Sequence, residues 1–228
     1  MHRVYAGQKT CDCPPHYLSC LSPKEWIKAQ LGVWRFAYEK RDIRDKTLHP
    51  ATFPIGLARR VIELFTHRGE LVLDPFVGSG TTLVAAQDLD RNALGLDLQE
   101  EYIALARRRI KEQAGLFIIG GCSSVPVQLA ICDDARNAAA YVEPGSLKLL
   151  FTSPPYANLL NCPRKNKSRR SADRKNSQYL KVEQYSQDPR DLGTLGLAKY
   201  TREMQRIFAS FLPLFSPMGQ CVINVPDM

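Results

Sequence analysis

The sequence lacks any run of about 18 apolar residues, so it offers no candidate for a membrane-spanning helix. Its start also lacks the apolar core of a signal peptide, because Gln8, Lys9 and Asp12 come early. We therefore expect a cytoplasmic protein that does not bind membranes. Acidic residues are in the minority: 23 Asp and Glu stand against 31 Lys and Arg, and the formal net charge of +8 favours a polyanionic partner. Charge alone would suit an acidic membrane surface equally well.

The cysteine count argues against a disulfide framework, because seven is an odd number and the cysteines are spread through the chain. Cys11, Cys13, His16 and Cys20 are all metal-ligand types and lie close together in the sequence. Their spacing is tighter than that of ordinary zinc motifs, and prolines interrupt it. The sequence therefore favours an irregular arm with buried thiols and no metal.

With 228 residues the chain is long enough for one α/β domain with a sizeable core. We predict an N-terminal arm over 1–48 and a main domain over 49–228. The arm carries large apolar side chains, which we expect to pack on the main domain: Trp26, Trp34, Phe36 and Tyr38.

The stretch from Leu71 to Thr82 is the most informative part of the sequence. Leu71 to Leu73 form a short apolar run typical of a buried strand, which ends at Asp74-Pro75. Gly78 and Gly80 allow a sharp turn and a close approach to a ligand, and a helix is expected to begin at Thr81 with free amide groups. A P-loop would need Lys in place of Thr81, and a dinucleotide fingerprint would need Gly in place of Leu83. The stretch therefore predicts a ligand cradle of neither kind.

Apolar runs and amphipathic stretches alternate along the rest of the chain, which predicts an α/β fold with a mainly parallel sheet. Further strands are expected at 93–98, 127–132, 147–151 and 220–225. Helices are expected from Pro54, from Thr81, around 102–110 and around 200–212, with Pro217 and Gly219 forming a turn before the last strand. The run Arg107–Arg109 reads as a solvated helix face.

A second chemical motif, Thr152-Ser-Pro-Pro-Tyr156, follows the expected strand at 147–151. Its position is the carboxyl edge of the sheet, where open α/β sheets bind ligands. The prolines stiffen the loop, and Ser153 and the Pro154 carbonyl can accept the hydrogens of an amine, which makes its nitrogen a better nucleophile. The aromatic ring of Tyr156 can stack on a planar ligand. Asp97, at the end of the expected strand at 93–98, can accept both hydroxyls of a ribose.

Residues 74–82 resemble the first signature of S-adenosylmethionine-dependent methyltransferases that act on exocyclic amines of DNA bases, and Ser153–Tyr156 resemble the catalytic tetrapeptide of that family. The resemblance implies a Rossmann-like methyltransferase fold with a doubly wound, mainly parallel sheet. It also implies S-adenosylmethionine as cofactor and double-stranded DNA, with a flipped target base, as substrate. The two motifs stand in permuted order relative to the commonest members, and the sequence has no candidate for the two last strands that the family usually has. A restriction-modification partner is a further implication.

The tetrapeptide Ser-Pro-Pro-Tyr favours methylation of cytosine at N4. The alternatives are adenine N6, an amine in structured RNA, and a non-catalytic nucleic-acid-binding subunit with the same fold. Resemblance and spacing together assign catalysis to Ser153, Pro154, Pro155 and Tyr156. The resemblance implies that the cofactor is bound by His49, Pro50, Thr52, Phe53, Asp74, Pro75, Phe76, Gly78, Ser79, Gly80, Thr81, Thr82, Asp97 and Asp134.

Two details of this assignment concern neighbours in the sequence. Asp134 is preferred by register as the acceptor for the adenine amine, and Asp133 is expected to be its exposed neighbour. Between 157 and 195 the chain forms a basic loop, with seven Lys and Arg in 164–175. This loop could contact DNA phosphates or could simply be a solubilising segment.

Overall fold

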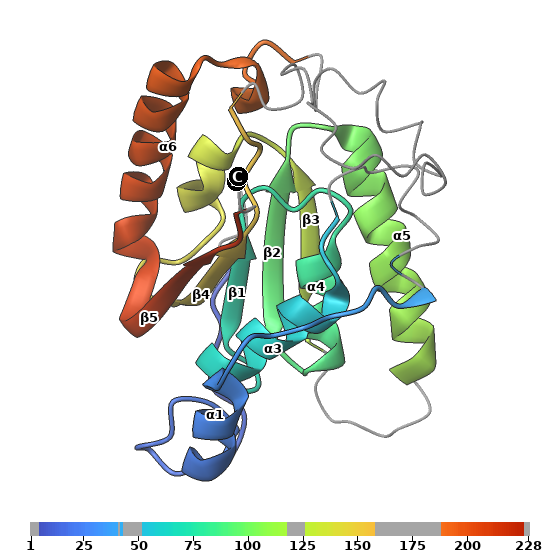
Figure 1. Ribbon diagram of the computed structural model, residues 1–228, viewed down its shortest axis with the longest axis vertical. Coiled ribbons are helices and arrows are strands. Elements are labelled where there is room, and N and C mark those ends of the chain that lie inside the picture. The colour runs from blue at the N-terminus through green and yellow to red at the C-terminus, as the bar shows by residue number, and fades with distance from the viewer. Residues whose placement is uncertain (1–4, 41, 43–51, 118–125, 158–187, 226–228) are drawn as a thin grey trace.

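The computed structural model describes residues 5–40, 42, 52–117, 126–157 and 188–225 (Figure 1). In these ranges the helices and strands, in chain order, are α1 (Pro23–Gln30), α3 (Ile55–Phe65), β1 (Leu71–Asp74), α4 (Thr81–Asp88), β2 (Asn92–Asp97), α5 (Glu100–Phe117), β3 (Gln128–Cys132), the 3-10 helix η1 (Ala135–Ala140), β4 (Leu147–Thr152), η4 (Leu192–Thr194), α6 (Leu197–Phe211), η5 (Leu212–Leu214) and β5 (Phe215–Ile223). Within the described ranges, none of these helices has the length and apolar character needed to cross a membrane.

The strands form one parallel sheet in the order β3-β2-β1-β4-β5. β1 lies at the centre, with β2 and β3 on one side and β4 and β5 on the other. The winding direction therefore reverses between β1 and β4, and the carboxyl ends of these two strands meet at a topological switch point, where such sheets bind ligands. This order confirms the expected Rossmann-like methyltransferase fold with a doubly wound parallel sheet.

Two apolar cores lie on the two faces of the sheet. On one face α3, α4 and α5 cover the strands (Figure 1). There, Leu83 and Ile103 pack with Val72 of β1. On the other face α6 and η1 cover the strands, and Phe211 packs with Leu73. Because consecutive side chains of a strand point to opposite faces and both faces are covered, the strands read as continuous apolar runs in the sequence.

The last strand differs from its prediction. Pro217 and Gly219 were expected to turn the chain before a strand at 220–225, but both lie inside β5. The turn signal instead appears as an irregular pairing with β4: Leu147 pairs with Phe215, whereas Leu149 pairs with Gln220. Proline and glycine are tolerated at such an irregularity because ladder hydrogen bonds are already interrupted there.

The N-terminal arm packs against the sheet and against α3. Tyr5 forms a parallel bridge with Val142, and the indole of Trp26 donates a hydrogen bond of 2.8 Å to the Leu64 carbonyl. Tyr38 donates to the Thr52 carbonyl at 2.9 Å. These contacts join residues 5–38 to the rest of the described chain. The division into an arm and a main domain at residue 48 stays a prediction, because 43–51 lie outside the described residues.

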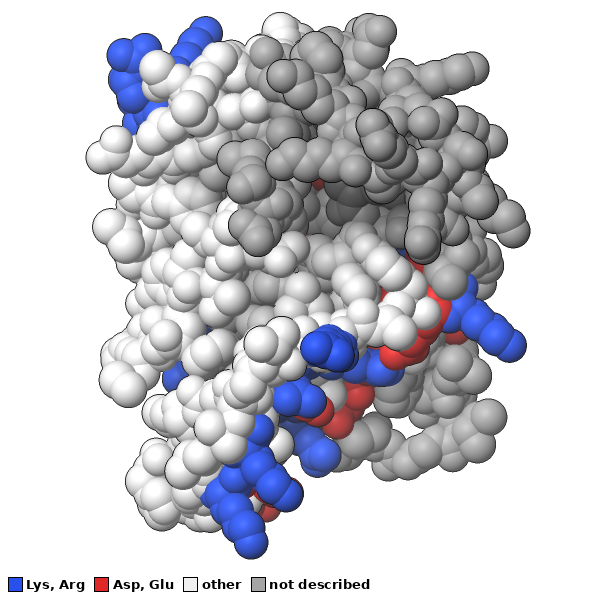
Figure 2. Space-filling view, in the orientation of Figure 1, with Lys and Arg blue, Asp and Glu red and all other residues white. Residues whose placement is uncertain are grey.

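The charge of the chain is not gathered into one stripe on the face shown in Figure 2. There, the described Lys and Arg side chains stand in separate groups, and acidic side chains lie among those in the lower part of the view. The basic loop at 164–175 lies outside the described residues, so its contact with phosphates stays a prediction.

Candidate active site

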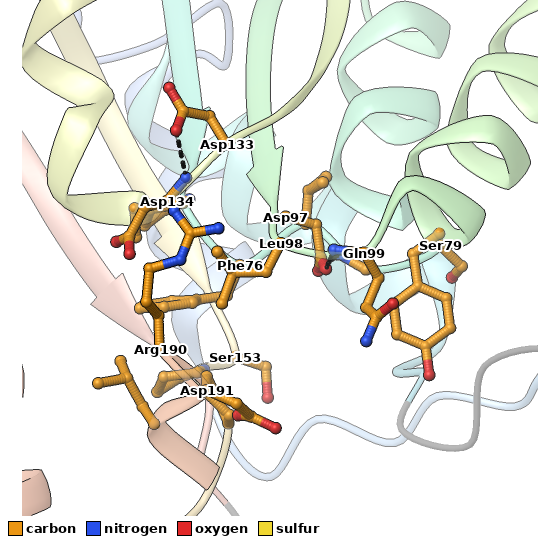
Figure 3. Close-up of a pocket in the computed structure, with 18 of the residues that line it drawn as sticks. Phe76, Ser79, Asp97, Leu98, Gln99, Asp133, Asp134, Ser153, Arg190 and Asp191 are labelled. Atoms are coloured by element: carbon orange, nitrogen blue, oxygen red, sulfur yellow. Dashed lines mark hydrogen bonds between the residues drawn. The ribbon is translucent and has the colours of Figure 1, made fainter. Parts of the chain in front are cut away.

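One pocket lies over the carboxyl ends of β1, β2, β3 and β4 (Figure 3). It encloses about 880 Å³ of empty space, counting the part that is open to solvent, and it lies at the edge where open α/β sheets bind their ligands. Its wall contains 13 of the 18 residues that the sequence assigned to catalysis or cofactor binding: Thr52, Phe53, Pro75, Phe76, Gly78, Ser79, Thr81, Asp97, Asp134, Ser153, Pro154, Pro155 and Tyr156. His49 and Pro50 lie outside the described residues.

The glycine turn forms the floor of the pocket between β1 and α4. Gly78 and Gly80 have φ angles of 49° and 82°, in the left-handed region that side chains with a Cβ disfavour. A Cβ on Gly80 would also lie 2.7 Å from the Ala106 Cβ, so α5 packs directly on this turn. Gly80 is the N-cap of α4 and gives no side-chain cap, which leaves amide donors at the start of the helix for a ligand.

Asp74 lies beneath this floor and does not line the pocket. Its carboxylate accepts hydrogen bonds of 2.6 Å from Thr82 of α4 and 2.6 Å from Thr152 of β4, and one of 3.2 Å from the Phe76 amide. Burial raises the pKa of Asp74 to about 6. Asp74 and Thr82, which the sequence assigned to cofactor binding, are thus not among the lining residues. Asp74 joins the glycine turn to the strand that carries the Ser153 loop.

Asp97 follows β2 and lines the pocket, as expected for a ribose ligand. Its two oxygens accept from the Gly78 amide at 3.0 Å and from the Gln99 amide at 2.9 Å (Figure 3). Each carboxylate oxygen has a second lone pair, so both can also accept from a ligand hydroxyl. Burial raises the pKa of Asp97 to about 6.

The prediction that the run 107–109 is a solvated helix face is wrong for Arg109, which is buried. Its guanidinium is only 5% exposed and donates to the Ser79 carbonyl at 2.7 Å, to the Ser79 hydroxyl at 3.0 Å and to the Thr81 hydroxyl at 3.1 Å. A second nitrogen lies 3.9 Å from the carboxylate of Asp42, which is itself buried. Arg109 thus holds the glycine turn from the side of α5, whereas Arg108 is half exposed.

Asp133 and Asp134 both line the pocket, so Asp133 is not the exposed neighbour that the sequence suggested. Asp133 accepts from Tyr141 at 2.6 Å and from the Asp134 amide at 2.7 Å. Asp134 caps η1 by accepting from the Arg136 amide at 2.9 Å, and it is paired with the Arg136 guanidinium at 2.7 Å. Both carboxylates therefore serve the local fold, and both lie where a ligand amine could reach them (Figure 3).

The Ser153 loop forms the wall opposite β2. The hydroxyls of Ser153 and Tyr156 are hydrogen-bonded at 2.7 Å, and the Asn224 side chain donates to Ser153 at 3.5 Å. The Asn224 amide also donates to the Thr152 carbonyl at 2.8 Å, so the end of β5 braces this loop. The sequence did not single out Asn224, because one polar residue after an apolar strand carries no signal by itself.

The pocket is also lined by residues that the sequence analysis did not assign to the site. Gln99 and Tyr102 follow β2, and Arg190 and Asp191 precede η4. Tyr102 read as part of an apolar helix face. Arg190 is paired with Asp188 at 2.7 Å, and Asp191 caps η4 through the Gly193 amide at 2.8 Å. Nothing local in the sequence distinguishes these residues from an ordinary charged turn.

The strand order and a pocket over the carboxyl ends of four strands define the class, a domain with the Rossmann-like methyltransferase fold. Comparison with known proteins then shows which methyltransferases the chain is similar to. Residues 10–108 match the family described as DNA methylase, of the N6 and N4 type. Together with the relatives below, this match confirms the resemblance to amino-group DNA methyltransferases.

Two curated relatives illustrate the similarity. Type II methyltransferase M.BglI of Bacillus subtilis is 39% identical over 92 residues, which are 40% of this chain and 25% of that protein. Type II methyltransferase M2.MboI of Moraxella bovis is 36% identical over 100 residues, 43% of this chain and 37% of that protein. The chain thus spans well under half the length of either relative.

Among solved structures, the complex of M1.HpyAVI with S-adenosylmethionine is 39% identical over a part that covers 29% of this chain and 32% of that chain, with a TM-score of 0.28. A score this low adds nothing to the fold assignment, which rests on the strand order.

Proposed function

We propose that the pocket binds S-adenosylmethionine and that the protein transfers its methyl group to the N4 amine of cytosine in DNA. One observation carries the proposal: the glycine turn and the Ser153–Tyr156 loop, 72 positions apart between Thr81 and Ser153, line the same pocket. A donor held by the first wall can therefore meet an amine held by the second. Similarity to type II methyltransferases supports DNA as the substrate.

The donor set of the pocket fits the cofactor. Asp97 offers paired oxygens for ribose hydroxyls, and Asp134 offers an acceptor for the adenine amine. The free amides at the start of α4 suit the carboxylate of the methionine part, because they carry the positive end of the helix dipole. When bound, the sulfonium supplies an electrophilic methyl group.

The second wall prepares the amine. The Ser153 hydroxyl can donate to Tyr156 at 2.7 Å and accept from Asn224, and it then keeps one lone pair for accepting an amine hydrogen. The Pro154 carbonyl can accept the other hydrogen. Accepting both hydrogens places electron density on the nitrogen, and the stiff Pro154-Pro155 backbone holds it in line for attack, which is where most of the rate enhancement is expected. The proton that the amine loses passes to solvent.

The test combines cofactor binding with product identification. The protein is titrated with S-adenosylmethionine by calorimetry, then incubated with methyl-labelled cofactor and random-sequence pools of double-stranded DNA or RNA, and modified nucleosides are identified by mass spectrometry. The proposal expects N4-methylcytosine from DNA. N6-methyladenine would replace cytosine by adenine as the target, and product from RNA alone would reject DNA. Cofactor binding without any product would favour the non-catalytic subunit.

Variants separate the cofactor-binding side of the pocket, which includes Asp97 and the glycine turn, from the Ser153–Tyr156 loop. Asp97→Ala is expected to weaken cofactor binding, because burying the ribose hydroxyls without their acceptor costs roughly 1–3 kcal/mol, about 5- to 150-fold. Ser153→Ala is expected to leave cofactor affinity unchanged and to lose methylation. Ser146→Ala, at the opposite end of β4 and outside the pocket, is the matched control and should change neither. Equal cofactor affinity in Asp97→Ala and wild type would reject the assignment of the first wall.

A further inference from the structure

Four side chains with metal-ligand chemistry come together at the amino end of β1. Cys11, Cys13 and Cys20 of the arm and His67, which follows α3, place their ligand atoms within 4.8 Å of one another. The three thiols are partly buried, and His67 is only 4% exposed. The histidine is not the one that the sequence suggested: His16 is exposed, and its place is taken by a residue 47 positions after Cys20.

The hydrogen bonds of His67 fix which ring nitrogen faces the thiols. Its Nε2 lies 3.0 Å from the Tyr17 carbonyl, and because a carbonyl can only accept, Nε2 carries the proton. Nδ1 then presents its lone pair to the Cys11 and Cys20 sulfurs, at 3.5 Å and 3.7 Å. A metal-ligating histidine typically donates its other N–H to a backbone carbonyl in this way.

The three distances among Cys11, Cys20 and His67 match edges of a tetrahedron around zinc. With Zn–S bonds of about 2.3 Å and Zn–N bonds of about 2.0–2.1 Å, tetrahedral geometry requires S–S edges of roughly 3.8 Å and S–N edges of roughly 3.6 Å. The Cys11 and Cys20 sulfurs are 3.6 Å apart, and their distances to Nδ1 are 3.5 Å and 3.7 Å. A disulfide would require about 2.05 Å.

The surroundings suit a cluster of thiolates. The Arg68 amide donates to the Cys20 sulfur at 3.4 Å. The Lys9 ammonium donates to the Cys13 carbonyl at 2.7 Å and so lies beside the cluster, and the buried guanidinium of Arg91 interacts electrostatically with Cys20. Three thiolates and one divalent cation carry a net charge of about −1, which these positive groups offset.

We propose that Cys11, Cys13, Cys20 and His67 form a structural zinc site that fastens the N-terminal arm to the start of β1. All four positions of the tetrahedron are filled by protein ligands, which is the arrangement of structural rather than catalytic zinc. Binding releases the three thiol protons to solvent.

The location explains what the site would do. The arm lies alongside the segment that precedes β1, since the Thr10 amide donates to the Arg68 carbonyl at 2.9 Å. A Cβ on Gly69 would lie 2.2 Å from the Gln8 carbonyl, so the two segments approach as closely as glycine allows. The pocket lies at the other end of β1, whose four residues span about 13 Å. The metal therefore stabilises the central strand without entering the pocket.

The experiment measures metal in the whole chain, expressed in zinc-supplemented medium with a tag that contains no histidine. Elemental analysis by mass spectrometry is expected to find about one zinc per chain. After removal of zinc by a chelator, Co²⁺ alone is added, and the visible absorption of tetrahedral cobalt with thiolate ligands is expected.

Matched variants identify the ligands. His67→Gln and Cys20→Ser are expected to lower the zinc content at least roughly tenfold. His16→Gln and Cys221→Ser remove the same residue types outside the cluster and should leave it unchanged. His67→Cys restores a fourth ligand and should recover zinc, which distinguishes a lost ligand from a lost fold.

Three results would overturn the proposal. One is wild-type protein with neither stoichiometric metal nor cobalt absorption. Another is zinc that is lost in His16→Gln but retained in His67→Gln. The third is a Cys11–Cys20 disulfide in protein prepared under reducing conditions.

Discussion

The replacement Asp74→Asn should change how the stability of the chain depends on pH. The carboxylate is 1% exposed, and its pKa of about 6 in the folded chain lies above the ordinary value of 3.8 because burial disfavours its charge. A pKa difference of about two between the folded and unfolded chain corresponds to about 3 kcal/mol. Asn keeps the shape of the side chain and cannot ionise, so it removes this contribution.

The sign of the pH dependence follows from whether the folded or the unfolded chain holds the Asp74 proton more tightly. Between pH 3.8 and about 6 the folded chain binds the Asp74 proton and the unfolded chain does not. The free energy of unfolding therefore falls as the pH rises through this window, by up to about 1.4 kcal/mol per pH unit, and levels off above it. Below the window the contribution of the neutral carboxyl is fully present. Asp97, with the same pKa of about 6, acts in the same direction and is retained in the variant.

The assay is urea unfolding followed by circular dichroism at several pH values. When the pH is raised from about 5 to about 8, the free energy of unfolding of wild type is expected to fall by about 1.4 kcal/mol more than that of Asp74→Asn. Comparison of the two chains at each pH cancels the titrating groups that do not interact with Asp74; Asp97 does interact with it, so its own variant is measured as well. Asp97→Asn should show a difference of the same sign, and the double variant should be flatter than either. Parallel pH curves for wild type and Asp74→Asn would refute the buried, raised-pKa carboxyl.

Three further predictions concern the glycine turn and the basic loop. Arg109→Lys should lower the free energy of unfolding by roughly 1–3 kcal/mol and weaken cofactor binding in a titration, because one ammonium cannot replace the forked donors on Ser79 and Thr81; unchanged affinity would reject its role in holding the turn. Gly80→Ala should destabilise the chain by roughly 1–3 kcal/mol more than Gly145→Ala in urea unfolding, because both glycines have positive φ but only Gly80 faces Ala106; equal losses would contradict this contact. Neutralising the Lys and Arg of 164–175 should flatten the dependence of DNA affinity on salt, and an unchanged slope would leave the loop a solubilising segment.

The parts of the fold that the sequence predicts are those encoded locally. The five strands begin and end within a few residues of their apolar runs, apart from β5, because a strand covered on both faces must be apolar throughout. The two loops of the site were predictable for a similar reason. Glycines at 78 and 80 and prolines at 154 and 155 constrain the backbone by themselves, and the parallel sheet brings the ends of β1 and β4 together.

What the sequence does not predict depends on partners far apart in the chain. Arg109 stands in a run of three arginines, and nothing in that run shows which one points inward to Ser79, 30 residues earlier. His67 is separated from Cys20 by α1 and α3, so the cluster exists only once the arm has folded back to the start of β1. Asp133 and Asp134 are adjacent and alike in the sequence, and only the turn into η1 determines that both face the pocket.

Asp74 shows why identity with a motif does not assign a residue to ligand contact. All nine positions from 74 to 82 match one signature, yet in this structure they divide into a lining set and a supporting set. Asp74 and Thr82 are buried and hydrogen-bonded to each other, and Thr152 of β4 donates a second hydrogen bond to Asp74. A residue that fixes the distance between two walls is as constrained in identity as one that contacts the ligand, because a shift of about 1 Å in attack geometry is enough to cost about a hundredfold in rate. Thr152→Val, which keeps the shape of the side chain and removes only its bond to Asp74, should therefore reduce methyl transfer more than cofactor affinity.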